Sequence, residues 1–255
     1  MVANIVKLGF ITILLLFFSA CASSQKAVKE VIQTNATSII ESDYEKIRKQ
    51  IIEFKTKLDK RNPKSYDKNL SDRIYSLLKS SNGDFLLKYN NIVLDNYRDY
   101  LQLAFSKNEV PIRNDYLVLG LYYLVNNAYE VNNDYKITAL QFDVKKLQDL
   151  YKNLQLIKWK IKVDRDMNGD YLFLTWQNNW QIEMEQKYKD KPYTYEDIQN
   201  LEFIKNKRET IYSHSNFSFE VILTQMLDYT ANSIRVLGEE PKELGLSALK
   251  MFIFI

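Results

Sequence analysis

Glycine and proline are scarce in this sequence, and their scarcity constrains the fold more than any other feature. The 255 residues include only 6 glycines and 4 prolines. Tight turns and Gly-rich loops depend on these two residue types, so an all-β sandwich is disfavoured and long helices are favoured. A chain of this length is ample for a buried core. The sequence therefore predicts a predominantly helical protein.

Composition and charge exclude several classes of function. The 35 Lys and Arg residues against 32 Asp and Glu residues give a net charge of +3, too small to indicate nucleic acid as a partner. The single cysteine excludes a disulfide framework, and the single histidine excludes a multi-histidine zinc site. Neither a phosphate-binding loop nor a dinucleotide-binding glycine pattern occurs.

The amino end has the pattern of an export signal. Lys7 is the only cationic side chain in residues 1–20, and it is followed by an apolar run over residues 8–20. This run covers about 20 Å as a helix, which is less than the ~30 Å hydrocarbon core of a bilayer. It predicts the hydrophobic region of a cleaved signal peptide rather than a permanent membrane span.

The signal ends in Phe18-Ser19-Ala20-Cys21. This sequence resembles the lipobox of bacterial lipoproteins, whose usual pattern is Leu, a small residue, Ala or Gly, then Cys; Phe18 departs from it. The resemblance covers residues 1–21 only. It implies cleavage after Ala20 and a thioether-linked diacylglycerol with an N-terminal acyl chain, such as palmitate, on Cys21. The alternative is an ordinary cleaved signal followed by a free cysteine.

The residue after the cysteine implies a location. In the lipoproteins of diderm bacteria, Ala22 in place of aspartate implies export to the outer membrane, facing the periplasm; in a monoderm organism the protein would lie at the cell surface. Residues 21–41 are expected to form a lipidated tether. Residues 42–255 are expected to form a single α+β body, helical over 42–135 and mixed over 136–255.

Apolar spacing places the helices. Five apolar residues at alternating steps of three and four predict the first helix: Tyr44, Ile47, Ile51, Phe54 and Leu58. A capping-box pattern predicts its start near Ser42, and Asn62-Pro63 predicts its end. Further helices are predicted over residues 66–78, 84–105, 114–130, 143–156, 194–208 and 216–237.

A β-hairpin is predicted over about residues 157–184. Ile157, Trp159, Ile161 and Val163 alternate with lysines, which is the period of a half-buried strand. Asn168-Gly169 fits the centre of a type I′ turn, and the register this turn sets pairs apolar with apolar residues. The Trp-rich face of the hairpin is expected to cover the helices.

The tip of this hairpin has the first half of a calcium-binding loop. Acids or amides occupy positions one, three, five and seven, with Gly169 at six: Asp164, Asp166, Asn168 and Asp170. Thr175 stands where the bidentate glutamate should close the loop. A polar Asn-Gly turn explains the same residues without an ion and is the favoured interpretation.

The lysines of the same segment are the second candidate for binding. On a strand, Lys158, Lys160 and Lys162 would form a ladder able to receive anionic glycan or lipid head groups. A solvated strand face that discourages edge pairing is the favoured alternative.

No catalytic residue is predicted. His214 is the only imidazole, and no Gly-x-Ser-x-Gly elbow accompanies it. A glycosidase needs only two carboxylates about 5–10 Å apart. Five acids in and after the predicted hairpin are candidates: Asp164, Asp166, Asp170, Glu183 and Glu185.

Three functions remain open. The favoured one is a non-catalytic, lipid-anchored envelope protein that binds or positions another envelope component. The alternatives are an envelope glycan hydrolase using two carboxylates, and a calcium or ligand receptor centred on residues 164–170. We expect the membrane, through the anchor, and an envelope protein as partners, no nucleic acid, and no cofactor besides the covalent lipid.

Overall fold

The structure is a computed structural model that describes residues 34–80, 85–130, 141–189 and 191–245. A helix over residues 34–61 is followed by α2 (Lys68–Lys79), β1 (Lys88–Tyr89), β2 (Ile92–Val93), α3 (Tyr97–Ala104), α4 (Arg113–Tyr129), α5 (Val144–Val163), α6 (Asn179–Tyr188), α7 (Tyr195–Gln199), α8 (Glu202–Lys205) and α9 (Ser218–Val236). Helices dominate, and β1 and β2 form a small antiparallel hairpin. The predicted class, a predominantly helical α+β fold, is confirmed.

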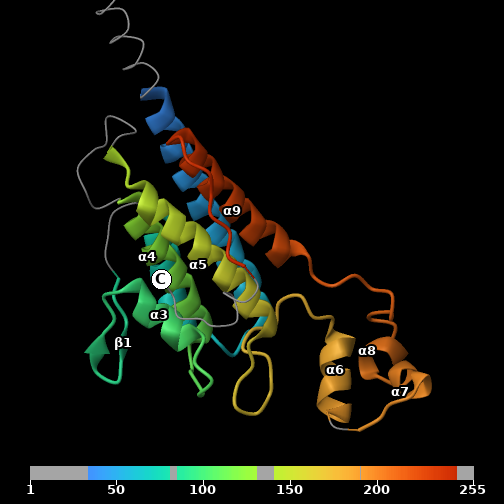
Figure 1. Cartoon of the computed structure of the whole chain (residues 1–255). Coiled ribbons are helices and arrows are strands. Elements are labelled where there is room, and N and C mark those ends of the chain that lie inside the picture. The colour runs from blue at the N-terminus through green and yellow to red at the C-terminus, as the bar shows by residue number, and fades with distance from the viewer. Residues whose placement is uncertain (1–33, 81–84, 131–140, 190, 246–255) are drawn as a thin grey trace, which may run out of the picture.

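The core lies between long helices that run side by side (Figure 1). α4 is buried along almost its whole length, and α3, α5 and the 34–61 helix cover it. The predicted stripe of the 34–61 helix, from Tyr44 to Leu58, is buried in this core. Gly120 allows α3 and α4 to approach closely, because a Cβ atom there would lie 2.7 Å from Cδ2 of Leu101.

The first helix starts earlier than its capping pattern predicts. Residues 34–41 are already helical, so Ser42 lies inside the helix and the predicted start there is wrong. Ile40 is fully buried and extends the apolar stripe by one turn, and burial of this stripe outweighs a local capping pattern. The predicted end at Asn62-Pro63 is confirmed.

The structure differs from the predictions in two segments: a hairpin replaces part of a predicted helix, and a helix replaces part of a predicted hairpin. The segment 84–105, predicted as one helix, contains the β1–β2 hairpin, in which Tyr89 pairs with Ile92. Asn90 and Asn91, with φ of 50° and 65°, supply the positive angles that a type I′ turn requires. α3 begins only after Asn96, whose side chain accepts a hydrogen bond from the Arg98 N–H.

The hairpin predicted over 157–184 is wrong. α5 continues to Val163, because the buried residues Leu150, Leu154, Ile157 and Ile161 form one helical stripe against α4 and α9. An alternation seven residues long fits a helix as well as a strand, and the longer stripe decides. The Asn168-Gly169 turn is present, with Gly169 at φ +83°, but only an isolated bridge between Arg165 and Tyr171 flanks it.

The carboxyl-terminal part forms a small lobe and a long helix. α6, α7 and α8 lie at the end of the molecule opposite residue 34 (Figure 1). The predicted capping box at Thr194 is confirmed, although its helix ends at Gln199 rather than near residue 208. The last predicted helix is confirmed as α9, with Gly238 at φ +87° just beyond its end.

The signal segment, with Ala20 and Cys21, lies outside the described residues. Among the helices of the described residues, each is too short or too polar to cross a bilayer.

Candidate functional site

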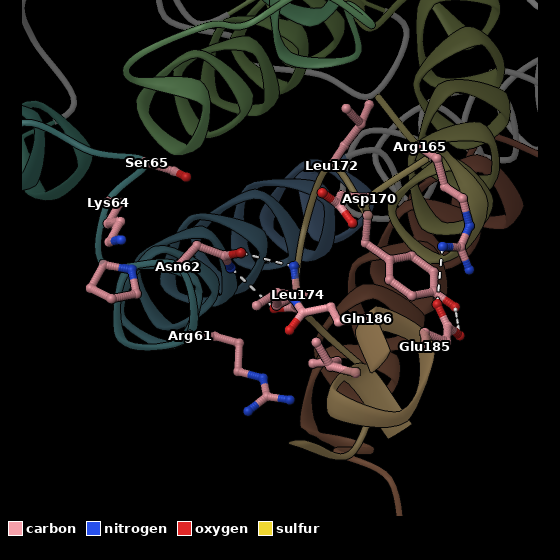
Figure 2. A pocket seen from close by; sticks show the side chains of 13 residues that line it. Arg61, Asn62, Lys64, Ser65, Arg165, Asp170, Leu172, Leu174, Glu185 and Gln186 are labelled. Carbon is pink, nitrogen blue, oxygen red and sulfur yellow. Dashed lines mark hydrogen bonds and ion pairs between the residues drawn. The ribbon is translucent and has the colours of Figure 1, made fainter. Parts of the chain in front are cut away.

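A charged hollow of about 370 Å³ lies between the end of the 34–61 helix, the loop after α5, and α6 (Figure 2). Its size falls in the lower part of the range of small-ligand sites. The hollow is lined by Arg61, Asn62, Pro63, Lys64, Ser65, Arg165, Asp170, Tyr171, Leu172, Leu174, Ile182, Glu185 and Gln186.

Asn62 fixes the loop that forms the floor of this hollow. Its Nδ2 donates to the carbonyl oxygens of Leu58 (3.1 Å) and Leu174 (3.0 Å), and its Oδ1 accepts from the Leu174 N–H (2.8 Å). The buried Asn62 amide thereby holds Leu174 of the loop after α5 against the end of the first helix. The sequence indicates Asn62 only as the residue before a helix-ending proline.

Arg61 brings a half-buried positive charge to the hollow. Its guanidinium donates to Asn179 Oδ1 and to the Gln177 carbonyl oxygen, both at 2.5 Å and both neutral acceptors. Burial lowers its pKa, and the nearby charge of Glu209 partly offsets this. Over the described ranges, no carboxylate lies within ion-pair distance of Arg61, and its buried Nε has no hydrogen-bond partner.

The opposite wall is a preformed group of three side chains. Arg165 donates to Glu185 Oε2 at 3.0 Å and lies 3.7 Å from the centre of the Tyr171 ring. The Tyr171 hydroxyl donates to Glu185 Oε1 at 3.1 Å. Burial, together with the charge of Glu185, raises the pKa of Tyr171, so this hydroxyl stays protonated. Glu185 is therefore occupied as an acceptor on both oxygens.

The structure places the four predicted calcium ligands on one loop but gives them separate roles. Asp166 Oδ1 accepts from the backbone N–H groups of Asn168 (2.8 Å) and Asp170 (3.0 Å), and Asp164 pairs with Lys160. Asp170 lines the hollow, and in the described part of the chain its carboxylate has no hydrogen bond or ion pair. No cluster of His, Cys, Asp and Glu able to hold a metal occurs among the described residues.

The predicted lysine ladder is wrong, because its residues lie on a helix rather than a strand. Lys158 and Lys162, one turn apart on α5, both pair with Glu220 at 2.5 Å. Partial burial acts to raise the pKa of Glu220, but the two lysines hold it below its usual value. Lys160 lies on another side of α5, paired with Asp164.

Two other candidates have structural partners. Glu183 accepts from the backbone N–H groups of Glu202 (2.7 Å) and Phe203 (3.2 Å) at the start of α8. Burial acts to raise its pKa, but these bonds and Lys187 lower it, which is the opposite of what a general acid requires. His214 is exposed in the segment before α9, with Phe217 as its ring neighbour.

A second hollow, of about 740 Å³, shares Lys64, Ser65, Tyr171 and Leu172 with the first. Its arginine, Arg113, is buried and donates to the carbonyl oxygens of Ala104, Ser106 and Asn108 at 2.7–2.8 Å. Arg113 therefore holds the loop between α3 and α4 rather than facing a ligand.

Sequence reasoning missed a buried ionic cluster behind the hollow. Lys55 Nζ lies 2.8 Å from Asp59 and 2.9 Å from Asp115, and Lys55 and Asp115 are 0% exposed. Burial raises the pKa of Asp115; burial lowers that of Lys55, but the two carboxylates raise it overall. Asn114 links the cluster to the hollow, since its Nδ2 donates to Asp59 and to the Asn62 carbonyl oxygen.

Comparison with known proteins adds no functional information: no family model matches the sequence, and no curated protein or solved structure matches it.

Proposed function

We propose that the protein is a lipid-anchored envelope protein that binds or positions another envelope component through the end of its body farthest from the anchor. The lipobox-like sequence at residues 18–21 supports the anchor on Cys21 and, in a diderm bacterium, a place on the outer membrane facing the periplasm. The envelope component would bind at the opposite end of the body.

The geometry of the first helix supports this arrangement. Residues 34–61 form one continuous helix, which spans about 42 Å at 1.5 Å per residue. The hollow lies at its Arg61 end, whereas the tether would join it at residue 34. An anchored chain would therefore hold the hollow at the far end of the helix from the tether.

Exposed apolar side chains at the same end carry the proposal. Ile92 is 68% exposed, Met167 76% and Tyr212 82%. They belong to the β1–β2 hairpin, the loop after α5 and the segment after α8, all of which lie at the end opposite residue 34 (Figure 1). Exposed aromatic residues and methionines are enriched in protein-interaction surfaces, and these side chains provide candidates for such a surface at this end.

The anchor is tested with Cys21→Ala. We expect the native protein to incorporate labelled palmitate and to fractionate with membranes, and the variant to do neither. Globomycin, which blocks lipoprotein signal cleavage, should cause the uncleaved form to accumulate. A membrane-bound, processed Cys21→Ala chain would contradict the anchor.

The binding surface is tested by site-specific photo-crosslinking in the native envelope. A photoreactive amino acid at Tyr212 or Met167 should give an adduct of one defined mass, identified by mass spectrometry. The same amino acid at Lys49, an exposed position on the first helix away from the hollow, serves as the control. Adducts from Lys49 but not from Tyr212 or Met167 would contradict a binding surface at this end.

A glycan hydrolase is the second candidate, because Asp170 and Glu185 both line the hollow. In that case the purified protein should release soluble fragments from isolated cell-wall glycan. Both Asp170→Asn and Glu185→Gln should abolish the release. Activity that survives both substitutions would exclude this pair.

A further inference from the structure

We propose that the hollow binds a short zwitterionic peptide, with its carboxylate toward Arg61 and Lys64 and its ammonium group toward Asp170. This inference rests on the proposed function only in taking the ligand to be an envelope component. It names the chemical class of that component and the residues that would recognise it.

The charges of the hollow are divided between two walls. Figure 2 shows Arg61 and Lys64 on one side and Asp170, Arg165 and Glu185 on the other. Arg165 and Glu185 neutralise each other through their ion pair at 3.0 Å. The remaining charges are therefore positive on one wall and negative on the other, which matches a ligand carrying both signs.

Within the described part of the chain, these remaining charges form no ion pair with a group of opposite sign. Arg61 is half-buried and donates only to neutral oxygens, so the nearby charge of Glu209 offsets its desolvation only in part and no ion pair completes it. Lys64 and Asp170 are exposed, and across the described ranges neither forms an ion pair. A ligand carboxylate would supply the missing anion, and charge-assisted hydrogen bonds of this kind are short and directional.

The surface between the walls suits a peptide. Leu172, Leu174 and Ile182 line the hollow with aliphatic surface for a ligand side chain. Ser65 and Gln186 line it with neutral groups that can hydrogen-bond to peptide amides. The hollow lies at the opposite end of a helix of about 42 Å from the expected tether.

The test measures affinity of the full mature chain, purified in detergent, by isothermal titration calorimetry. The probes are the tripeptide Ala-Leu-Ala with free ends, its N-acetylated form and its C-amidated form. We expect the free peptide to bind, and each blocked form to bind about fivefold to tenfold more weakly, because each lacks one charged contact.

Matched variants test which side chain of the hollow contacts which charged end of the peptide. Lys64→Gln should weaken binding of the free and N-acetylated peptides and leave the C-amidated peptide unchanged. Asp170→Asn should weaken the free and C-amidated peptides and leave the N-acetylated one unchanged. Lys49→Gln, an exposed lysine on the same helix as Arg61 but remote from the hollow, is the control and should alter none of them.

Three results would overturn the inference. One is no binding of the free tripeptide at millimolar concentration. Another is equal effects of Lys64→Gln on all three peptides. The third is binding of glycerophosphoethanolamine in place of the peptides, which would assign the hollow to a lipid head group. None of these results depends on the anchor, which the Cys21→Ala fractionation tests separately.

Discussion

Lys55 is a full positive charge in the interior of a helical bundle, held by two carboxylates and by the faces of Tyr66 and Tyr75, each 5.4 Å away. Such a cluster adds little stability relative to apolar residues of the same size, but removing one partner leaves the others buried and uncompensated. Asn114 connects the cluster to the hollow, because its side chain donates to both Asp59 and the Asn62 carbonyl oxygen.

Lys55→Met is therefore expected to lower the free energy of unfolding by about 3–5 kcal/mol, because Asp59 and Asp115 lose their cation. Urea denaturation at pH 7 measures the change. Lys57→Met is the matched control: Lys57 is partly exposed and pairs with Glu53 at 3.4 Å, so it should cost less than ~1 kcal/mol. Equal losses of unfolding free energy in the two variants would show that the buried cluster contributes no more to stability than the exposed ion pair.

Tyr100 makes the stability of the folded protein depend on pH in the alkaline range. Burial raises its pKa to about 12, although the N–H of Leu87 donates to its oxygen and acts in the other direction. The pKa in the unfolded chain is about 10, so the folded state binds this proton more tightly. Its contribution is complete below pH 10 and is lost as the pH rises through the folded pKa.

Tyr100→Phe should thus make the free energy of unfolding fall less steeply between pH 10 and pH 12. Urea denaturation at several pH values in this window measures it, with tyrosinate absorbance as the titration signal. A steeper fall in Tyr100→Phe than in the native protein would contradict a raised pKa of Tyr100 in the folded state.

At the scale of elements, long patterns predict the structure and short ones do not. The stripe from Tyr44 to Leu58 and the segment that forms α9 are predicted correctly, because many residues share one period. The alternation of residues 157–163 is too short to separate strand from helix, and contact with α4 and α9 decides it. The β1–β2 hairpin escapes prediction, because its strands have two residues each and its turn is Asn-Asn.

The candidate site is predictable only in part. The sequence indicates Asp170 and Glu185 as candidate acids, and both line the hollow. It does not indicate Arg61 and Asn62, since their importance depends on contacts with residues more than 100 positions away. Lys55 carries no signal, because a lysine beside an apolar stripe ordinarily extends into solvent.

The course of α5 predicts different costs at two neighbouring positions. Ile161 is fully buried, whereas Val163 is 42% exposed. Ile161→Ala should cost about 2–5 kcal/mol and Val163→Ala less than about 1 kcal/mol in urea denaturation. In a strand the two side chains would share one face, so similar losses at both positions would contradict the helix.

At the scale of the whole molecule, side chains that bond to backbone join the helical bundle to the lobe formed by α6, α7 and α8. Arg61 and Asn62 hold residues 174–179 from the bundle side. Asn178 donates to the Ser213 carbonyl oxygen at 2.7 Å, and Asn179 donates to Glu209 at 2.6 Å from the lobe side. The shape of the hollow therefore depends on this joint.

Asn62→Ala is expected to loosen the joint without unfolding the bundle. Three hydrogen bonds to backbone groups are lost, at a cost of about 1–3 kcal/mol for the groups left unpaired. Hydrogen exchange by mass spectrometry should show faster exchange over residues 172–188 and unchanged exchange in α4. Uniform acceleration across the chain would show that Asn62 supports the bundle as a whole.

The unbroken helix over residues 34–61 also restricts how the protein can change its length. Inserting a single residue would rotate everything beyond it by about 100° and turn the apolar stripe away from α4. Only insertions near whole turns, such as seven residues adding about 10 Å, keep the stripe in phase. The height of the hollow above the start of this helix is thus adjustable in steps, and homologues of different reach should differ by multiples of about a turn.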